Sequence, residues 1–270
     1  MDLFNIETGF FLVDGGALFG VVPKLAWNAE YECDENNFCK LVMRSLLIKS
    51  KNKLILVDAG VGIKHQDVMS EFGFSGLKPI EEELKRLGFS CSDVTDVVLT
   101  HLHFEHCGGC TWIDYDFKLQ MTFPNATHWV AEEQWKAMLN PSAREENSFF
   151  LADMMEVFKK EKLKWINDEQ EIADGVRLAF ADGHTKAQIV VYVNDGKENV
   201  IFAGDVVPTA ANVPLDWLSA YDLDQVAALE AKRNILEFAV KNGSKLFFCH
   251  DKNVVSAKIA KAKDFYAVVE

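Results

Sequence analysis

Residues 100–109 read THLHFEHCGG, and this stretch decides how the rest of the chain is interpreted. Three of the seven histidines and one carboxylate fall within six residues, at His101, His103, Glu105 and His106. Imidazole and carboxylate are the ligands that zinc and similar divalent ions prefer. In an extended or turning segment His101 and His103 point the same way and reach one ion. After the chain bends, Glu105 and His106 reach a second ion, so the stretch predicts a two-metal site.

Two other interpretations of this stretch remain open. The first is a group of surface histidines without a shared role, which fits poorly with their place directly after an apolar strand expected at residues 97–99. The second is a redox motif, because Cys107 and Cys110 form a CxxC pair. The dense histidine cluster explains the segment better, and we interpret all six cysteines as free thiols.

Three further candidate ligands, His184, Asp205 and His250, each come just after a short apolar run that is expected to be a strand. Strand ends are rigid places from which side chains are presented to a site. Taken singly, each has an ordinary alternative as a loop histidine or a turn aspartate. Taken with the first cluster, they complete a set of seven ligands for two ions.

Asp58 ends another apolar run, at residues 54–57. A buried acid is costly unless it is paired. We interpret Asp58 as an acceptor that orients a ligand histidine through its second ring nitrogen, with an ordinary turn aspartate as the alternative. The remaining histidines, His65 and His128, are interpreted as structural or surface residues.

The composition restricts the functions that the chain supports. Its 270 residues are 49% hydrophobic and carry a formal net charge of -13, and an acidic surface repels nucleic-acid phosphates. No stretch reaches the roughly 18 to 20 apolar residues that span a membrane, and residues 1–11 lack the basic residues of a secretory signal. We therefore expect a cytoplasmic protein with no nucleic-acid or membrane partner. No linker or repeat divides the chain, so we expect a single domain over residues 1–270.

Apolar periodicity and breaker residues predict an α+β fold in which strands come in two batches, each followed by helices. This order indicates two sheets sandwiched by helices. Strands are expected at residues 41–48, 54–57, 97–99, 176–180, 189–193, 200–202 and 246–248, and helices at residues 79–87, 131–139, 145–163 and 222–240, with a short helix at the C-terminus.

At these residues the chain resembles the metallo-β-lactamase superfamily, whose signature is HxHxDH followed by a later His, an Asp and a final His. The candidate ligands and Asp58 follow the family's order. Residues 14–24, 123–126 and 204–209 are similar to the branch that holds quorum-quenching lactonases and methyl-parathion-hydrolase-like enzymes. The resemblance implies an αββα sandwich, with two mixed sheets flanked by helices and the metals at one edge of the sheets.

The resemblance also implies how the ligands are shared between two divalent ions, for which zinc is the first choice and iron, manganese or cobalt are also suited. The first ion is held by His101, His103 and His184, the second by Glu105, His106 and His250, and Asp205 bridges them. Two positions depart from the family pattern. Glu105 stands where the family has Asp, and Pro208 stands where some lactonases carry a Tyr that steadies the substrate.

The implied activity is that of a metal-dependent hydrolase. A metal-bridging hydroxide would attack a lactone, a carboxyl ester or an organophosphate, and Asp205 or Glu105 would relay a proton to the leaving group. The expected partner is therefore a small-molecule substrate, and a homodimer is left open. Apolar residues of the substrate loops, with plain core as the alternative, are Phe19, Val22, Trp27, Trp217 and Leu218.

Two alternatives to this hydrolase are kept. A glyoxalase-II-like thioesterase shares the fold, but that family adds a basic C-terminal region where we expect a short mixed helix. A metal-binding protein of the same fold with weakened catalysis is the other, because Glu105 changes the second metal site.

Overall fold

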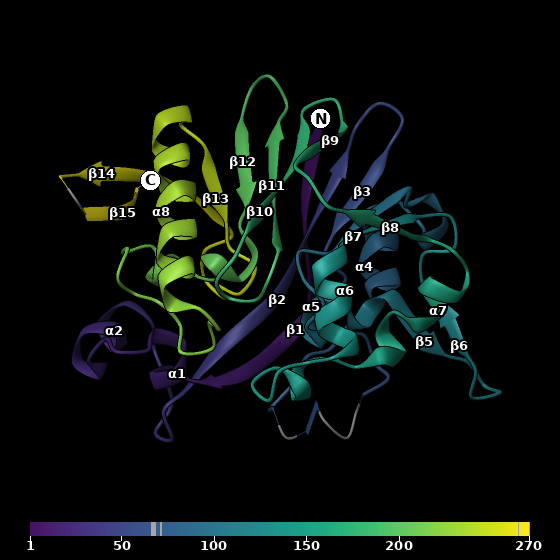
Figure 1. The fold of residues 1–270 in the computed structure, drawn as a ribbon, viewed down its shortest axis with the longest axis horizontal. Helices are drawn as coiled ribbons and strands as arrows, with labels where there is room; N and C mark the ends of the chain where they lie inside the picture. The colour runs from purple at the N-terminus through teal and green to yellow at the C-terminus, as the bar shows by residue number, and fades with distance from the viewer. Residues whose placement is uncertain (66–68, 71, 264, 270) are drawn as a thin grey trace. The chain divides into compact units, whose positions relative to one another are not determined.

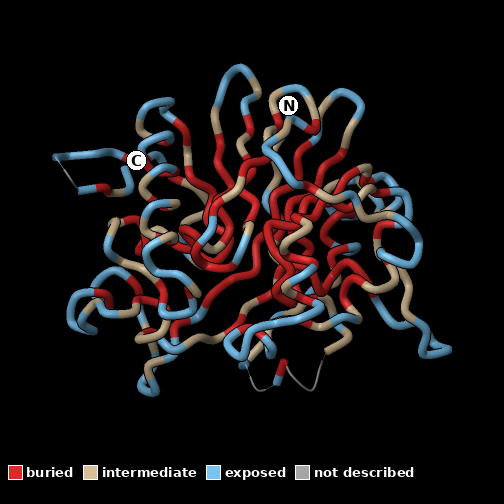
Figure 2. The backbone as a smooth tube through the Cα atoms, viewed as in Figure 1, coloured by how far each residue is buried: buried red, intermediate tan, exposed pale blue. Residues whose placement is uncertain are grey.

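The computed structural model describes residues 1–65, 69–70, 72–263 and 265–269. The chain divides into two compact units, the first formed by Met1–Phe10 and Met43–Asp168 and the second by Phe11–Val42 and Glu169–Glu270. Each unit has a buried apolar cluster of its own, and strands β1 and β2 of the first sheet contribute residues to both units. In Figure 2 the strand segments are largely buried and the tips of the connecting turns are exposed. The expectation of a single domain over residues 1–270 stays a prediction.

The first sheet is mixed and has six strands in the order β1-β2-β3-β4-β7-β8. β2 and β3 are antiparallel, whereas β3, β4, β7 and β8 run parallel to one another. Every residue of β3 is buried, as expected for a strand that is covered on both faces. The strands are β1 (Asp2–Asp14), β2 (Phe38–Lys49), β3 (Leu54–Val57), β4 (Asp96–Val98), β7 (Thr127–Ala131) and β8 (Leu163–Ile166).

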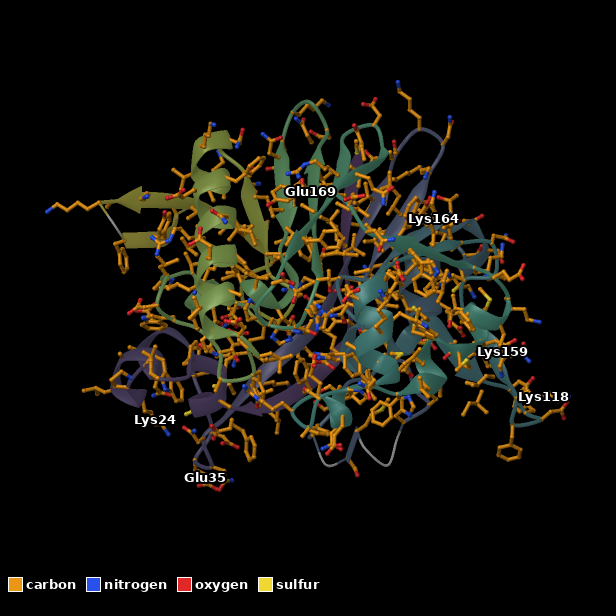
Figure 3. The ribbon with its side chains drawn as sticks, viewed as in Figure 1. Lys24, Glu35, Lys118, Lys159, Lys164 and Glu169 are labelled. Carbon is orange, nitrogen blue, oxygen red and sulfur yellow. The ribbon has the colours of Figure 1, made fainter. Side chains whose placement is uncertain are left out.

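Short helices accompany this sheet. α4 begins after Pro79 and has three acidic residues in its first turn, which stabilise a helix N-terminus, and Gly88 follows at a positive φ. A two-stranded hairpin, β5 (Thr111–Ile113) and β6 (Leu119–Met121), carries Lys118 near its outer end, where the side chain is exposed (Figure 3). The helices are α4 (Ile80–Arg86), α5 (Phe104–Cys107), α6 (Glu132–Leu139) and α7 (Met155–Lys159).

The single helix expected at residues 145–163 is wrong. The structure has two 3-10 turns, Glu146–Ser148 and Leu151–Asp153, then α7, and β8 begins at Leu163. Asp153 is fully buried there and accepts from Lys64 at 2.7 Å and His65 at 2.6 Å. These contacts bend the segment, because an ion pair with Lys64 and a hydrogen bond with His65 satisfy the buried carboxylate and outweigh a modest local helix propensity. His65 is thereby a structural residue, as interpreted.

The second sheet is also mixed, with seven strands in the order β15-β14-β13-β12-β11-β10-β9. Only β12 and β13 are parallel among its described pairs. A hairpin turn through Asn194-Asp195-Gly196 joins β11 to β12. The strands are β9 (Gln170–Ala173), β10 (Val176–Ala181), β11 (Gln188–Asn194), β12 (Asn199–Phe202), β13 (Lys245–Phe247), β14 (Ser256–Ala262) and β15 (Phe265–Val269).

The long helix α8 (Gln225–Asn242) runs along one face of this second sheet (Figure 1). The Asp224 carboxylate accepts from the amides of Val226 and Ala227 at its start, and Gly243 closes its end in the left-handed conformation. Its buried face packs on apolar residues of β10, β11 and β12. Two short helices, α1 (Gly15–Phe19) and α2 (Lys24–Glu30), also belong to this unit.

The short helix expected at the C-terminus is wrong, because β14 and β15 form a hairpin there. Ala257 and Ile259 are buried while Lys258 and Ala260 between and after them are exposed, which is the two-residue period of a strand. β14 also pairs with β13 and so extends the sheet. In the described part of the chain, no helix combines the length and apolar composition needed to cross a membrane.

Candidate metal centre

The histidine cluster of the first unit is positioned by the end of β4 and the start of α5. His103 has an extended backbone directly before α5, and His106 lies in its single turn. The ring centroids of His101 and His103 are 4.5 Å apart, and those of His101 and His106 are 4.1 Å apart. All three rings are buried. The structure thus brings these three candidate ligands together, as the spacing predicts.

Two glycines allow the chain to pack closely behind the cluster. A Cβ on Gly108 would lie 2.2 Å from the carbonyl oxygen of Val61, and one on Gly109 would lie 2.1 Å from that of Ala59. Side chains there would push apart the loop after β3 and the 3-10 turn after α5. The glycines therefore fix His106 close to Asp58, which precedes Ala59.

Asp58 is the buried partner of this cluster. Its carboxylate accepts from His106 Nδ1 at 2.8 Å and from the Thr100 amide at 2.8 Å. The Thr100 hydroxyl donates to the same carboxylate at 2.9 Å and lies 3.0 Å from His101 Nδ1. A carboxylate only accepts, so His106 carries a proton on Nδ1 and points Nε2 the other way. The Thr100 hydroxyl gives its own proton to Asp58 and therefore accepts from His101, which likewise carries a proton on Nδ1. The interpretation of Asp58 as the partner of a candidate ligand is confirmed.

The carboxylates of the first unit include one that sequence reasoning found and one that it missed. Glu105 Oε2 is buried and has no hydrogen-bond partner among the described residues, a costly state that a bound cation relieves. Glu145, which is 6% exposed, places Oε1 at 3.6 Å from His103 Nε2. No local signal marks Glu145, because it stands at the start of a segment expected to be an ordinary helix.

In the second unit, Asp205 lies between two histidines. Its Oδ2 is 3.5 Å from His184 Nε2, and its Oδ1 is 3.2 Å from His250 Nε2. Asp205 sits in the 3-10 turn Gly204–Val206 that follows β12, and His250 follows β13, the parallel neighbour of β12. The expected placement of these ligands at strand ends is what brings the three together.

The outer nitrogens of both histidines are fixed by acceptors. His184 Nδ1 faces Asp222 Oδ1 at 3.1 Å, and His250 Nδ1 faces the carbonyl oxygen of Val42 at 2.8 Å. A carbonyl or carboxylate oxygen only accepts, so each Nδ1 carries the proton. Asp222 was missed as a functional residue, because in sequence it is simply the first residue of an expected helix.

A divalent cation fits this donor set. With Nδ1 beside an acceptor, each ring points its Nε2 toward an oxygen of the Asp205 carboxylate. The two Nε2 atoms lie 3.5 Å and 3.2 Å from the carboxylate oxygens, which is close enough for a nitrogen and an oxygen to bind the same cation. Imidazole nitrogen and carboxylate oxygen are ligands that suit zinc, iron, manganese and cobalt alike.

Comparison with known proteins identifies the family. The model of the metallo-beta-lactamase superfamily matches residues 44–250. The chain belongs to the metallo-beta-lactamase superfamily. This membership confirms the resemblance drawn from the sequence, the α+β metallo-β-lactamase fold and the expectation of a metal-dependent hydrolase.

Relatives of this superfamily member include lactonases. An N-acyl homoserine lactonase from Bacillus cereus is 25% identical over 227 residues, which cover 80% of this chain and 83% of that protein. A probable metallo-hydrolase from Mycobacterium tuberculosis is 29% identical over 188 residues, covering 61% of this chain and 56% of that protein.

Solved structures share the fold over nearly the whole chain. A probable metal-dependent hydrolase from Staphylococcus aureus superposes with a TM-score of 0.90 at 24% identity, covering 100% of this chain and 97% of that one. The dizinc quorum-quenching lactonase AidC, in complex with a product, gives a TM-score of 0.81 at 20% identity and covers 99% and 93% of the two chains.

The expected substrate-loop residues divide into core and half-exposed groups. Phe19 and Trp27 are buried and stack with ring centroids 5.1 Å apart, so they belong to the core of the second unit. Trp217, which meets Phe19 edge-on at 5.9 Å, is half-buried, as are Leu218 and Val22. The last three remain the candidates for substrate contact.

Proposed function

We propose that this superfamily member is a dinuclear hydrolase of lactones or carboxyl esters, with organophosphates as a second substrate class. The ligand set would be His101, His103, Glu105, His106, His184, Asp205 and His250. The observation that carries the proposal is the position of Asp205, whose two oxygens each face the Nε2 atom of a different imidazole. A carboxylate with one oxygen toward each of two ligand histidines is suited to bridge two ions. The named activity of the lactonase relatives supports the choice of ester-like substrates.

Two divalent ions, when bound, supply a nucleophile from water near neutral pH and polarise the attacked oxygen. The chain's own residues hold and orient these ligands. Asp58 and Asp222 keep the Nδ1 protons on His106 and His184, so that both rings offer Nε2. Asp205 and Glu105 are the carboxylates placed to pass a proton to the leaving group. Trp217 and Leu218 supply apolar surface for an acyl chain or aryl group.

The test reconstitutes metal-stripped protein with zinc and measures bound metal together with turnover of an N-acyl homoserine lactone, an aryl ester and a phosphotriester. We expect two metals per chain and turnover of the lactone or the ester. Asp205→Asn should lower kcat/KM by at least about 100-fold, because several kcal/mol of transition-state stabilisation is lost. The matched control is Asp174→Asn, which alters an exposed turn aspartate.

Two results would contradict the proposal. Tight metal binding without turnover of any acyl or phosphoryl substrate would favour a metal-binding protein. Turnover confined to thioesters would favour a glyoxalase-II-like activity. Replacing zinc by manganese, iron or cobalt in the same assay would then identify the metal that supports the highest rate.

A further inference from the structure

Cys249 places a sulfur atom beside the proposed metal ligands of the second unit. It directly precedes His250 after the end of β13, and it is 1% exposed. Its Sγ lies 3.5 Å from Asp205 Oδ1, the same oxygen that faces His250 Nε2 at 3.2 Å. The potential ligand atoms of Asp205, Cys249 and His250 all lie within 4.8 Å of one another.

The separations of the sulfur and the nitrogen from Asp205 Oδ1 match two edges of a tetrahedral metal site. Zinc binds sulfur at about 2.3 Å and nitrogen or oxygen at about 2.0 to 2.1 Å. At the tetrahedral angle, these bond lengths put sulfur about 3.5 Å from an oxygen ligand and nitrogen about 3.3 Å from it. The observed separations from Asp205 Oδ1 are 3.5 Å to Cys249 Sγ and 3.2 Å to His250 Nε2. These two separations are those expected for an ion bound by sulfur, nitrogen and oxygen, and the ligand atoms of Cys249 and His250 lie within 4.8 Å of each other.

We propose that Cys249 is a sulfur ligand of the ion bound by His250 and Asp205, an inference that rests on the proposed metal-dependent function. The alternative role is that of a thiol which only donates a hydrogen bond to Asp205. When the metal binds, the thiol proton leaves to solvent and the sulfur bonds to the ion as a thiolate. The ion then has nitrogen, oxygen and sulfur donors.

A sulfur ligand narrows the choice of metal. Thiolates are soft donors that favour zinc and cobalt, whereas manganese and magnesium favour all-oxygen sites. The site of His250 and Asp205 should therefore select zinc over manganese. Without the sulfur, the site should prefer zinc over manganese less strongly, because the remaining imidazole and carboxylate donors also bind manganese.

The experiment follows the thiolate directly. Metal-stripped protein is titrated with Co²⁺, and absorption is recorded in the visible region, where bound cobalt absorbs, and in the near ultraviolet, where thiolate-to-cobalt charge transfer absorbs. Wild type should show both signals. Cys249→Ser and Cys249→Ala should keep the visible bands and lose the near-ultraviolet band. Cys91→Ser, which removes a half-buried thiol outside the candidate ligand groups, should keep both.

The outcomes separate the two proposals. Suppose that two cobalt ions bind per chain. If wild type then shows no charge-transfer band, or if Cys249→Ala keeps the band unchanged, the sulfur ligand is refuted and the proposed function still stands. A chain that binds no cobalt at all overturns both.

A second variant protects against misfolding of the Cys249 substitutions. A chain in which Cys249 is the only remaining cysteine should keep the full charge-transfer band, and loss of the band would refute the assignment. Competition between Zn²⁺ and Mn²⁺ gives an independent readout, since Cys249→Ser should reduce the preference for zinc by about tenfold or more. An unchanged preference would contradict the proposal.

Discussion

Replacing Asp58 tests the framework that holds the histidine cluster. Its carboxylate, 2% exposed, receives three hydrogen bonds, from His106 Nδ1 and from the amide and hydroxyl of Thr100. Asp58→Ala leaves these buried donors unpaired, at about 1 to 3 kcal/mol each with partial relaxation. Asp58 also has a φ of +59°, which aspartate tolerates and alanine resists by about 1 kcal/mol. Together these effects predict a loss of about 4 kcal/mol in the free energy of unfolding.

The variant Asp58→Asn removes the negative charge of the carboxylate but keeps the size and shape of the side chain. Asparagine tolerates the left-handed backbone and accepts through one oxygen, but its amide nitrogen cannot accept from His106 or Thr100. We expect about half the stability loss of Asp58→Ala. Metal affinity should fall by about 10- to 100-fold in both variants, because His106 loses the partner that fixes its tautomer.

Urea unfolding of the metal-free protein measures the first effect, and competition with a chromophoric chelator measures the second. Asp174→Asn is again the control and should stay within about 0.5 kcal/mol of wild type. If Asp58→Ala costs less than about 1 kcal/mol and binds zinc as wild type does, the hydrogen bonds of Asp58 do not support the site, and the reasoning from its geometry is refuted.

Three further predictions concern the buried side chains of Lys232 and His128 and the length of the Glu105 side chain. Burial lowers the pKa of Lys232 to about 7 from 10.5. Between these two pH values the unfolded chain binds more protons than the folded one, so the free energy of unfolding should rise with pH by about 3 to 5 kcal/mol. Urea unfolding at pH 7 and pH 10 measures the rise, and Lys232→Met should remove it. Burial likewise lowers the pKa of His128 to about 4 from 6.5. Because the unfolded chain takes up the proton first, the free energy of unfolding should fall by about 3 kcal/mol as the pH drops from the unfolded pKa to the folded one. His128→Phe should flatten this part of the profile, and an unchanged slope would assign it to other groups. Glu105→Asp shortens the acid by one bond of about 1.5 Å and should raise zinc occupancy and esterase rate; a sharp fall in both would make the glutamate a specialisation of this chain.

Several elements could be predicted because their signals are local. The apolar runs that became β3, β10, β11 and β12 end in turn residues, and such runs are recognisable as buried strands without any tertiary information. The candidate ligands follow from the same signal together with the dense histidine cluster at residues 101–106, since several histidines and acids directly after buried strands can share one site. His128 is also structural, as interpreted, because it lies fully buried in β7.

Other elements depend on contacts that a local pattern does not contain. Residues 145–163 have helical propensity, yet Asp153 turns inward to pair with Lys64 and His65, which lie almost ninety positions earlier in the chain. Ser256–Ala262 and Phe265–Val269 form strands because β13 offers an edge for pairing with β14, which pairs in turn with β15. Strand propensity is largely a measure of such neighbours, and they are invisible until the sheet is known.

The same distinction explains why the sequence predicts the candidate ligands of the site but only one of the groups that orient them, Asp58. Four histidines have Nδ1 beside an acceptor, yet the acceptors are unlike one another: an aspartate at 58, a threonine hydroxyl at 100, an aspartate at 222 and the backbone carbonyl of Val42. His250 and Val42 are 208 residues apart in sequence, and a backbone carbonyl carries no sequence signature at all. Because any acceptor keeps the proton on Nδ1, the requirement fixes a geometry and leaves the residue type open. Motifs therefore indicate which side chains are candidate metal ligands, whereas the groups that orient those side chains, Asp58 excepted, emerge only from the folded chain.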